Sequence, residues 1–255
     1  MAETAVQTNV GGLRAVELQY RAVREISGGH VAFYQSQTRL NAPQLGILMP
    51  GQFRPIAEMT NQALKLFYLE MSQALEAAKK FTEREMEYKW ISVYMPVRYL
   101  TERDAVKAAT ALCERFEVPT SRICFELSER LLTAEEPEIP NTIVSMRNVG
   151  FHFMLTGFGG NNCPMMRLSE FPVEYVMLSP EVTHFIGRSE RADNAVKSIV
   201  DFVNDLEAEA IADGVRSSKQ AETFYTFSCS YCAGSLAGKY MAERYVRRRQ
   251  EEESK

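Results

Sequence analysis

The stretch FHFMLTGFGG at residues 151–160 joins a short apolar run to a glycine-rich turn. The run 151–155 predicts a buried strand, and LTGFGG at 155–160 predicts the loop at its carboxyl end. In a barrel of alternating strands and helices, the chemistry lies at such strand ends. A metal-binding loop there needs carboxylates, but this sequence has Thr156 and Gly157. The stretch therefore indicates an enzyme-like framework without the acidic residues that metal chemistry requires.

The segments on either side of this stretch alternate between strand and helix patterns. Alternation of this kind predicts a mostly parallel sheet with right-handed crossovers, and seven or eight repeats favour closure into a barrel. The predicted strands are 16–23, 30–37, 89–95, 123–127, 151–155, 173–178, 207–212 and 229–233. The predicted helices are 52–82, 102–116, 138–148, 189–206, 217–227 and 235–249.

The domain organisation follows from the continuity of this pattern. No low-complexity linker interrupts it, so we expect an N-terminal tail at 1–15 and one barrel domain at 16–246. A charged tail at 247–255 follows, in which three arginines precede three glutamates. Such a mixed run is typical of a solvated helix end rather than of a phosphate-binding patch.

Composition excludes several classes of function. The 255 residues are 45% hydrophobic and 24% charged, as in ordinary soluble domains. A net charge of −4 provides no general attraction to a nucleic acid polymer or to acidic lipid. No apolar run approaches the ~20 residues that span a bilayer, and residues 1–12 lack the pattern of a secretory signal. We therefore expect a cytoplasmic protein without a membrane span.

The cysteines and histidines predict neither a disulfide framework nor a metal site. Five cysteines in a chain of this length argue against a disulfide scaffold. Cys229 and Cys232 have zinc-knuckle spacing, but a zinc site needs two further ligands and no second pair exists. His30, His152 and His184 are widely scattered. We expect the two cysteines to lie on a buried strand, and we predict no cofactor.

Three motifs, taken together, resemble those of a known family. They are LGILMPGQFRPIAE at 45–58, FELSE at 125–129 and ADGV at 212–215, and their order and spacing are similar to those of the bacterial EAL domain. The resemblance covers roughly residues 17–241. It implies an α/β fold, a modified TIM (β/α)8 barrel of the EAL type. Active members of the family hydrolyse cyclic di-GMP with two divalent metal ions.

The same resemblance marks the positions where the family holds its metals, and most of them have changed. Only Glu126 and Asp213 remain acidic, and Asp213 is one methylene shorter than the usual glutamate. Two-metal hydrolysis needs a carboxylate cage around ions about 4 Å apart, so we expect catalysis and metal binding to be lost. The changed positions are Gln35, Tyr94, Thr156, Gly157, Met177, Ser179, Arg216 and Ala233.

Three functions remain. The first is a catalytically inactive EAL-like regulatory or signalling protein that acts through contacts with an unidentified protein partner. The second is a metal-independent cyclic di-GMP receptor, for which Arg39, Glu126 and Asp213 are the residual ligand-binding candidates. The third, more distant, is a phosphodiesterase with a rearranged site. Against the receptor, Arg39 is also expected to pair with Glu126 or Glu58 as a framework residue.

Two further expectations concern the mouth of the barrel. Arg21, which replaces a glutamine of the family, and Arg216 would add positive charge there. The loop 160–167, which contributes to dimerisation in active relatives, makes a homodimer possible. We expect four aromatic side chains to close the old pocket: Phe33, Tyr34, Tyr94 and Tyr99.

Overall fold

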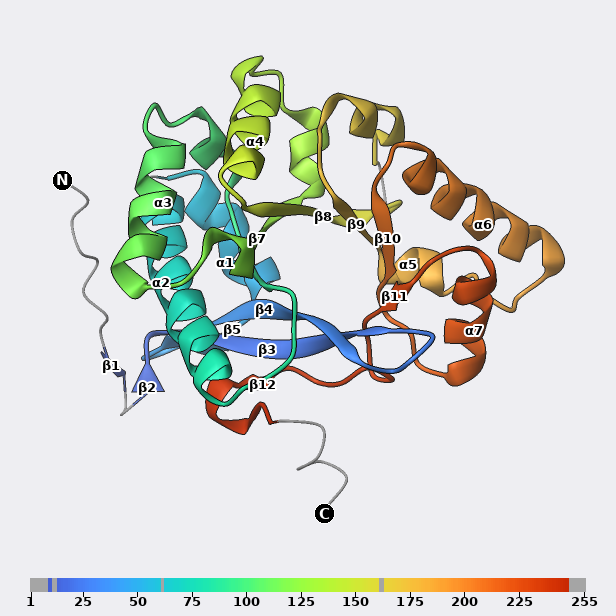
Figure 1. Ribbon diagram of the computed structural model, residues 1–255, viewed down its shortest axis with the longest axis horizontal. Helices are drawn as coiled ribbons and strands as arrows, with labels where there is room; N and C mark the ends of the chain where they lie inside the picture. Colours follow the sequence, from blue (N-terminus) through green and yellow to red (C-terminus); the bar gives the residue numbers. More distant parts are fainter. Residues whose placement is uncertain (1–8, 11–12, 61, 161–162, 248–255) are drawn as a thin grey trace.

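A closed barrel forms the centre of the protein (Figure 1). The computed structural model describes residues 9–10, 13–60, 62–160 and 163–247. In the described chain, ten strands form one sheet, and a further pairing of β3 with β4 closes it into a ring that leaves out β12 (Met241–Ala242) and β5 (Gly46–Leu48). The ring contains β3 Val16–Glu25, β4 Val31–Ala42, β6 Ile91–Tyr94, β7 Ile123–Ser128, β8 His152–Phe158, β9 Tyr175–Leu178, β10 Glu209–Ala212 and β11 Tyr231–Cys232.

One strand distinguishes this barrel from a regular TIM barrel. β3 runs antiparallel to both of its neighbours, β4 and β11, whereas the other ring pairings are parallel. The expected α/β barrel of the modified TIM type is therefore confirmed. Outside the ring, β5 (Gly46–Leu48) pairs with β4, and β12 (Met241–Ala242) pairs with β3.

Helices surround the ring and bury its outer face (Figure 1). They are α1 Pro50–Glu58, α2 Gln62–Glu83, α3 Ala105–Phe116, α4 Glu138–Asn148, α5 Pro180–Thr183, α6 Glu190–Asp205 and α7 Ser218–Thr226. Short 3-10 turns occupy Val97–Thr101, Thr120–Arg122, Glu129–Thr133, Met165–Glu170 and Glu243–Tyr245. None of the helices in the described ranges has the length and apolar character needed to cross a bilayer.

The barrel interior is apolar at the amino-terminal end of the parallel strands, which we call its lower half. Because strand side chains alternate between faces, every ring strand sends side chains inward, and these form a cluster separate from the outer core. Phe33 and Trp90 stack there with ring centroids 4.0 Å apart, and Tyr175 and Tyr231 pack against the Phe33 ring edge. This aromatic plug makes the lower half a packed core, so that chemistry is confined to the opposite end.

Two predicted elements have different bounds. The single helix predicted at 52–82 is wrong: the chain turns at Met59 and Thr60, and α1 and α2 are separate helices. The Thr60 hydroxyl donates to the Ala57 carbonyl at 3.0 Å and ends α1. The loop predicted to begin after 155 is also wrong, because β8 continues through Thr156 and Gly157 with a register irregularity before Phe158.

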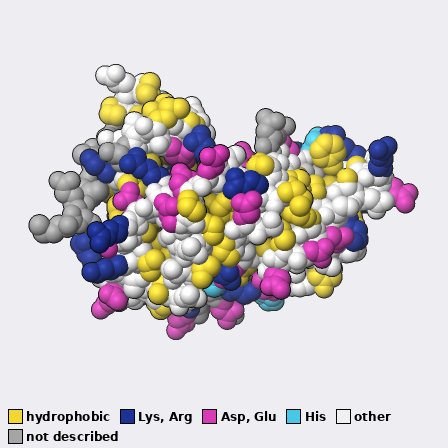
Figure 2. Space-filling model, turned by 90° about the horizontal axis from the view of Figure 1, so that it is seen from above, with side chains coloured by type: hydrophobic (Ala, Val, Ile, Leu, Met, Phe, Trp, Pro, Cys, Tyr) yellow, Lys and Arg dark blue, Asp and Glu magenta, His cyan; other side chains and the backbone are white. Residues whose placement is uncertain are grey.

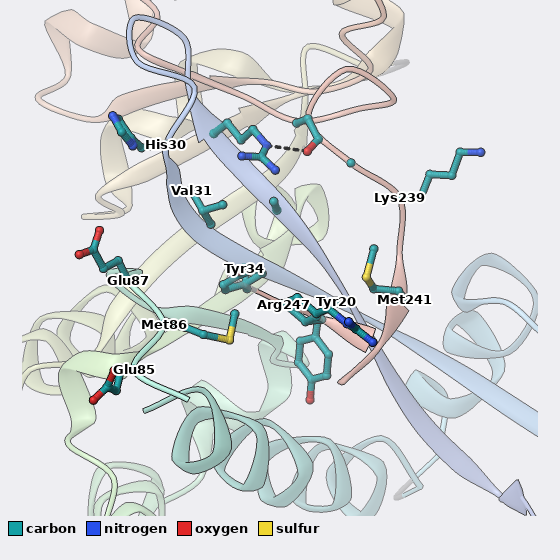
Figure 3. Close-up of a pocket in the computed structure, with 15 residues that line it drawn as sticks. Tyr20, His30, Val31, Tyr34, Glu85, Met86, Glu87, Lys239, Met241 and Arg247 are labelled. Atoms are coloured by element: carbon teal, nitrogen blue, oxygen red, sulfur yellow. Dashed lines mark hydrogen bonds between the residues drawn. The ribbon is translucent and has the colours of Figure 1, made fainter. Parts of the chain in front are cut away.

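The helix predicted at 235–249 does not form in its described part, 235–247. The chain instead turns after Gly234, whose φ is +129°, and after Gly238, whose φ is +148°. It then pairs as β12 with Tyr20 of β3. This extended segment leaves a cavity of about 390 Å³ on the outer face of the barrel wall (Figure 3).

Both predicted tails and the predicted contact loop lie partly outside the described residues. Of the tail 1–15, Asn9–Val10 and Leu13–Arg14 form a small antiparallel ribbon. Of the tail 247–255, only Arg247 is described, and of the loop 160–167, residues 161–162 are not.

Candidate functional site

A polar layer lies above the apolar plug, at the carboxyl end of the parallel strands. Arg21 on β3 and Gln35 on β4 are cross-strand neighbours, as are Ser92 on β6 and Cys124 on β7. Glu126 stands two residues beyond Cys124, and therefore on the same inward face. Asp213 follows directly after β10. The alternation of the strands thus brings polar side chains from separate parts of the sequence into one layer.

Arg21 is the centre of this layer. Its Nε donates to Gln35 Oε1 at 2.8 Å, and its Nη2 lies 2.9 Å from Asp213 Oδ1. The guanidinium carbon is 4.9 Å from the centroid of the Tyr240 ring, a geometry in which an aromatic face attracts a cation. Burial lowers the pKa of Arg21, but Tyr240 and Asp213 raise it above its ordinary value overall. Arg21 is therefore a permanently charged group inside the barrel.

Gln35 connects Arg21 to the second carboxylate. Its Nε2 donates to Glu126 Oε2 at 3.0 Å, while its Oε1 also accepts from the Tyr240 hydroxyl at 3.0 Å. Ser92 Oγ donates to the same Glu126 oxygen at 3.0 Å. Burial raises the pKa of Glu126, although the hydrogen bonds from Gln35 and Ser92 lower it in part. Arg21, Asp213 and Glu126 therefore belong to one connected network of hydrogen bonds and an ion pair.

A second cluster closes the rim beside β6. Tyr94 donates a short hydrogen bond to Glu58 of α1, and the Arg54 guanidinium lies 3.7 Å from the Tyr94 ring centroid. Arg130 also pairs with Glu58, and Arg54 pairs with Glu70 of α2 at 3.0 Å. Burial, followed by the contact with Glu58, raises the pKa of Tyr94. The phenol is therefore neutral and fixes α1 over the mouth of the barrel.

Of the four aromatic side chains that were expected to close the pocket, only Tyr94 lies at the mouth of the barrel. Phe33 belongs to the plug at the opposite end. Tyr34 and Tyr99 point outward into the core beneath the helices, where they contact Phe81 and Phe67. The expectation that all four close the pocket is wrong, because Phe33 and Tyr34 alternate between the two faces of β4 and Tyr99 lies in the 3-10 turn Val97–Thr101.

Of the two β8 positions, Gly157 has little room for a side chain. Thr156 Oγ1 donates to the Leu127 carbonyl at 3.3 Å. Gly157 has φ +79°, and a Cβ built there would lie 3.1 Å from Glu129 Oε2. An aspartate at this position would carry both backbone strain and a repulsive contact with Glu129.

The remaining predicted positions are scattered over different environments. Met177 is buried, with its sulfur 3.9 Å from Arg21 Nη2. Ser179 caps α5 by accepting from the Glu181 amide, and Ala233 belongs to the inner core. Arg216 is exposed, and its backbone N–H donates to Gln220 Oε1 at 2.9 Å. The expectation that Arg216 adds positive charge at the mouth stays a prediction.

Arg39 differs most from its expected place. It pairs with Glu17, its cross-strand neighbour on β3, at 2.8 Å. It is therefore not paired with Glu126 or Glu58, and it does not join the network that contains Glu126 and Asp213. Tyr240, in contrast, was not predicted as a site residue, because it fell inside the helix predicted at 235–249. Only the two glycines at 234 and 238 could have signalled a chain reversal.

The network does not fit a pair of divalent cations. Among the described residues, no three His, Cys, Asp or Glu side chains come close enough together to hold a metal ion. Asp213 already faces Arg21, which would repel a second cation. All five cysteines are free thiols, and Cys229 and Cys232 are both buried at β11.

The cavity of Figure 3 is separate from this network. Tyr20 and Tyr34 line it from the outward faces of β3 and β4, and Met86 and Met241 close its other sides. The Arg24 side chain donates to the Ala237 carbonyl at 2.8 Å and anchors the C-terminal segment across it.

The chain is similar to known signalling proteins. The sequence pattern of the EAL domain matches residues 5–240. Cyclic di-GMP phosphodiesterase RocR of Pseudomonas aeruginosa is 25% identical over 229 residues, which are 90% of this chain and 58% of RocR. Cyclic di-GMP phosphodiesterase PA2567 of the same organism is 18% identical over 93% of this chain and 40% of its own length. The chain thus spans about half the length of these relatives.

Solved structures share the fold at lower identity. The PaMucR phosphodiesterase in complex with c-di-GMP superposes with a TM-score of 0.81 at 18% identity, covering 91% of this chain and 94% of that one. The FimX EAL domain from Pseudomonas aeruginosa bound to c-di-GMP gives 0.77 at 15% identity, covering 90% and 91%. Because the family pattern matches nearly the whole sequence, the chain belongs to the EAL domain family.

Proposed function

We propose that this EAL domain is catalytically inactive and acts as a regulatory protein through contacts with other proteins. The observation that supports this is the network around Arg21. An internal cation, already paired with Asp213 at 2.9 Å, takes part of the space and ligand charge that two metal ions would need. Glu126 accepts from Gln35 and Ser92 through Oε2, so each remaining carboxylate already has one oxygen engaged within the protein.

The energetic barrier to metal binding supports the same proposal. A divalent cation that entered the layer would have to displace a buried guanidinium or lie beside it. Breaking a buried ion pair by removing one partner costs about 3–5 kcal/mol. A neutral amide such as Gln35 is also a weaker ligand for a hard cation than a carboxylate. Both effects act against the generation of a metal-bound nucleophile at neutral pH.

Hydrolysis of cyclic di-GMP tests the loss of activity directly. The purified chain is incubated with the nucleotide and either magnesium or manganese, and products are separated by chromatography. RocR, treated in parallel, shows that the assay detects turnover. We expect no linear dinucleotide from this chain above the rate without protein. Metal-dependent turnover would overturn the proposal in favour of a rearranged phosphodiesterase site.

Calorimetric titration with cyclic di-GMP, without metal, separates the regulatory protein from the receptor. We expect no binding heat at micromolar nucleotide, because Arg39 is paired with Glu17 and lies outside the network. Micromolar binding would favour the receptor instead. An Arg39→Ala variant would then show whether the pair with Glu17 opens to meet a phosphate.

A further inference from the structure

The outer wall of the barrel is covered only in part beside the hairpin of β3 and β4. In the described chain, residues 26–30 join β3 directly to β4, so no helix follows β3 as it does in a regular barrel. Beneath β3 in Figure 1 runs the C-terminal segment that contains β12. The cavity of about 390 Å³ lies between this segment, the hairpin and the loop after α2. It marks the stretch of wall where a covering element is missing from the described residues.

The rim of this cavity is divided by the sign of its charges. Figure 3 shows Glu85 and Glu87 on one side and Lys239 on the opposite side. Arg24 belongs to the basic side, because its Nε donates to the Ala237 carbonyl at 2.8 Å, two residues before Lys239. Over the middle of the face seen in Figure 2, by contrast, acidic and basic side chains are mixed. The rim therefore favours an occupant that carries both signs of charge at separate places.

The C-terminal tail starts at the acidic side of the cavity. Arg84, the residue after α2, donates to the carbonyl of Glu243 at 3.2 Å and to that of Val246 at 3.3 Å. These contacts hold the C-terminal segment against the chain that continues into Glu85. Arg247, the last described residue, lines the cavity. Residues 248–255 therefore continue from its rim.

The order of charges in the tail matches the order of charges across the cavity. The sequence of 247–255 is RRRQEEESK, in which basic residues come first and acidic residues follow after one glutamine. From the start of the tail, the rim presents its acidic side first and its basic side second. Four residues of extended chain span about 13 Å, which is enough to cross a cavity of about 390 Å³.

We propose that the tail 248–255 lies across this cavity as a strap that completes the barrel wall. Its two arginines lie beside Glu85 and Glu87. Its three glutamates lie beside Lys239 and Arg24, so that each part of the tail meets charge of the opposite sign. The inference goes beyond the proposed function and does not depend on nucleotide or metal binding at the mouth.

The floor of the cavity suits the arginines of the strap. Tyr20, Tyr34 and Met86 form an apolar floor, and all three are buried. An arginine has a long apolar stem below its charge, so Arg248 and Arg249 cover this floor while their guanidinium groups reach the rim. A guanidinium also stacks favourably on an aromatic face. Packing and charge therefore place the basic part of the tail at the same side.

Coupling with a carbodiimide tests the strap in the full chain, because this reagent joins an amine to a carboxylate in direct contact. Peptide mass spectrometry identifies the coupled pair. We expect Lys239 to couple to one of the glutamates 251–253. Lys79 and Glu117, which lie 2.7 Å apart, are the internal positive control, and Lys219, exposed on α7, is the negative control. The proposal is overturned if the control pair couples and Lys239 does not, or if Lys219 couples to the tail equally well.

A variant that keeps the charge of the tail tests the acidic side in the same way. Arg248→Lys/Arg249→Lys adds two amines that the reagent can couple. We expect coupling to Glu85 or Glu87, and none to Glu114, which is exposed on α3. Coupling to Glu114 alone would show that the strap does not follow the proposed direction.

A tail with its charges exchanged tests the order itself. This variant has glutamate at 247–249 and lysine at 251–253, so its net charge stays −4. We expect amide hydrogen exchange in residues 237–241 to accelerate by roughly fivefold or more, because several exposed ion pairs are lost together. Exchange in the wild type should also accelerate at about 0.5 M salt, which screens such pairs. Exchange in the variant at the wild-type rate would overturn the proposal and show that the tail does not cover the cavity.

Discussion

Replacing Arg21 with methionine tests whether the internal cation holds the polar layer together. The variant keeps a side chain of similar length but leaves Asp213, 2.9 Å away in the wild type, and Glu126 without their cation. Removal of one partner from a buried ion pair costs about 3–5 kcal/mol. The two side chains retain 11% and 16% exposure, so we expect the lower end, about 3 kcal/mol. At ~2–4 °C per kcal/mol, the melting temperature should fall by roughly 6–12 °C.

Trp90 provides the assay, because it is the single tryptophan and is fully buried against Phe33. Urea unfolding followed by its fluorescence reports the free energy of unfolding. The deficit of Arg21→Met should shrink as the pH falls, because protonation of the unpaired carboxylates removes their charge. The double variant Arg21→Met/Asp213→Asn should recover part of the loss. A single-variant loss below about 1 kcal/mol, or no recovery in the double variant, would refute the reasoning.

Three further substitutions probe the layer and the strand ends around it. Glu126→Gln should flatten the pH dependence of stability. Burial raises the pKa of Glu126, so the contribution of this group to stability is fully present below the ordinary carboxyl range and is lost as the pH rises through the raised value. Urea titrations at several pH values measure this, and parallel curves for both proteins would contradict it. Gly157→Asp should cost about 1–3 kcal/mol, because φ is +79°, and should give no phosphodiesterase activity; a stable, active variant would reverse both conclusions. Gly234→Ala should prevent normal folding in expression and circular dichroism tests, because its Cβ would lie 2.5 Å from the Val215 carbonyl oxygen, and a fully stable variant would show that this contact relaxes.

Hydrophobic periodicity alone was sufficient to predict most elements of the barrel. The helix predicted at 138–148 has those bounds as α4, and the strand predicted at 123–127 is one residue shorter than β7. These segments bury one face or both against neighbours, so their apolar pattern records their own secondary structure. The shared order of the motifs likewise predicted the EAL barrel, which the family match and the fold confirm.

Elements with weak local signals were not predictable in this way. The segment 235–249 has a helical composition, but its described part is extended because it pairs with β3. That pairing depends on where the whole sheet places β3, which no local sequence pattern records. The same long-range choice brings Tyr240 to Gln35 at 3.0 Å.

From the sequence alone, the barrel and the loss of acidic residues at its strand ends could be predicted, because both are written in local patterns and in residue identity. The tertiary structure decided which groups replaced those acids. Ring closure places Arg21 against Gln35 and Asp213, and the cross-strand register gives Arg39 to Glu17. Residues far apart in a sequence acquire their partners only when the sheet fixes their register. The acidic residues that are missing at Thr156 and Gly157 are thus part of a wider change, in which the Arg21 guanidinium supplies the positive charge of the polar layer.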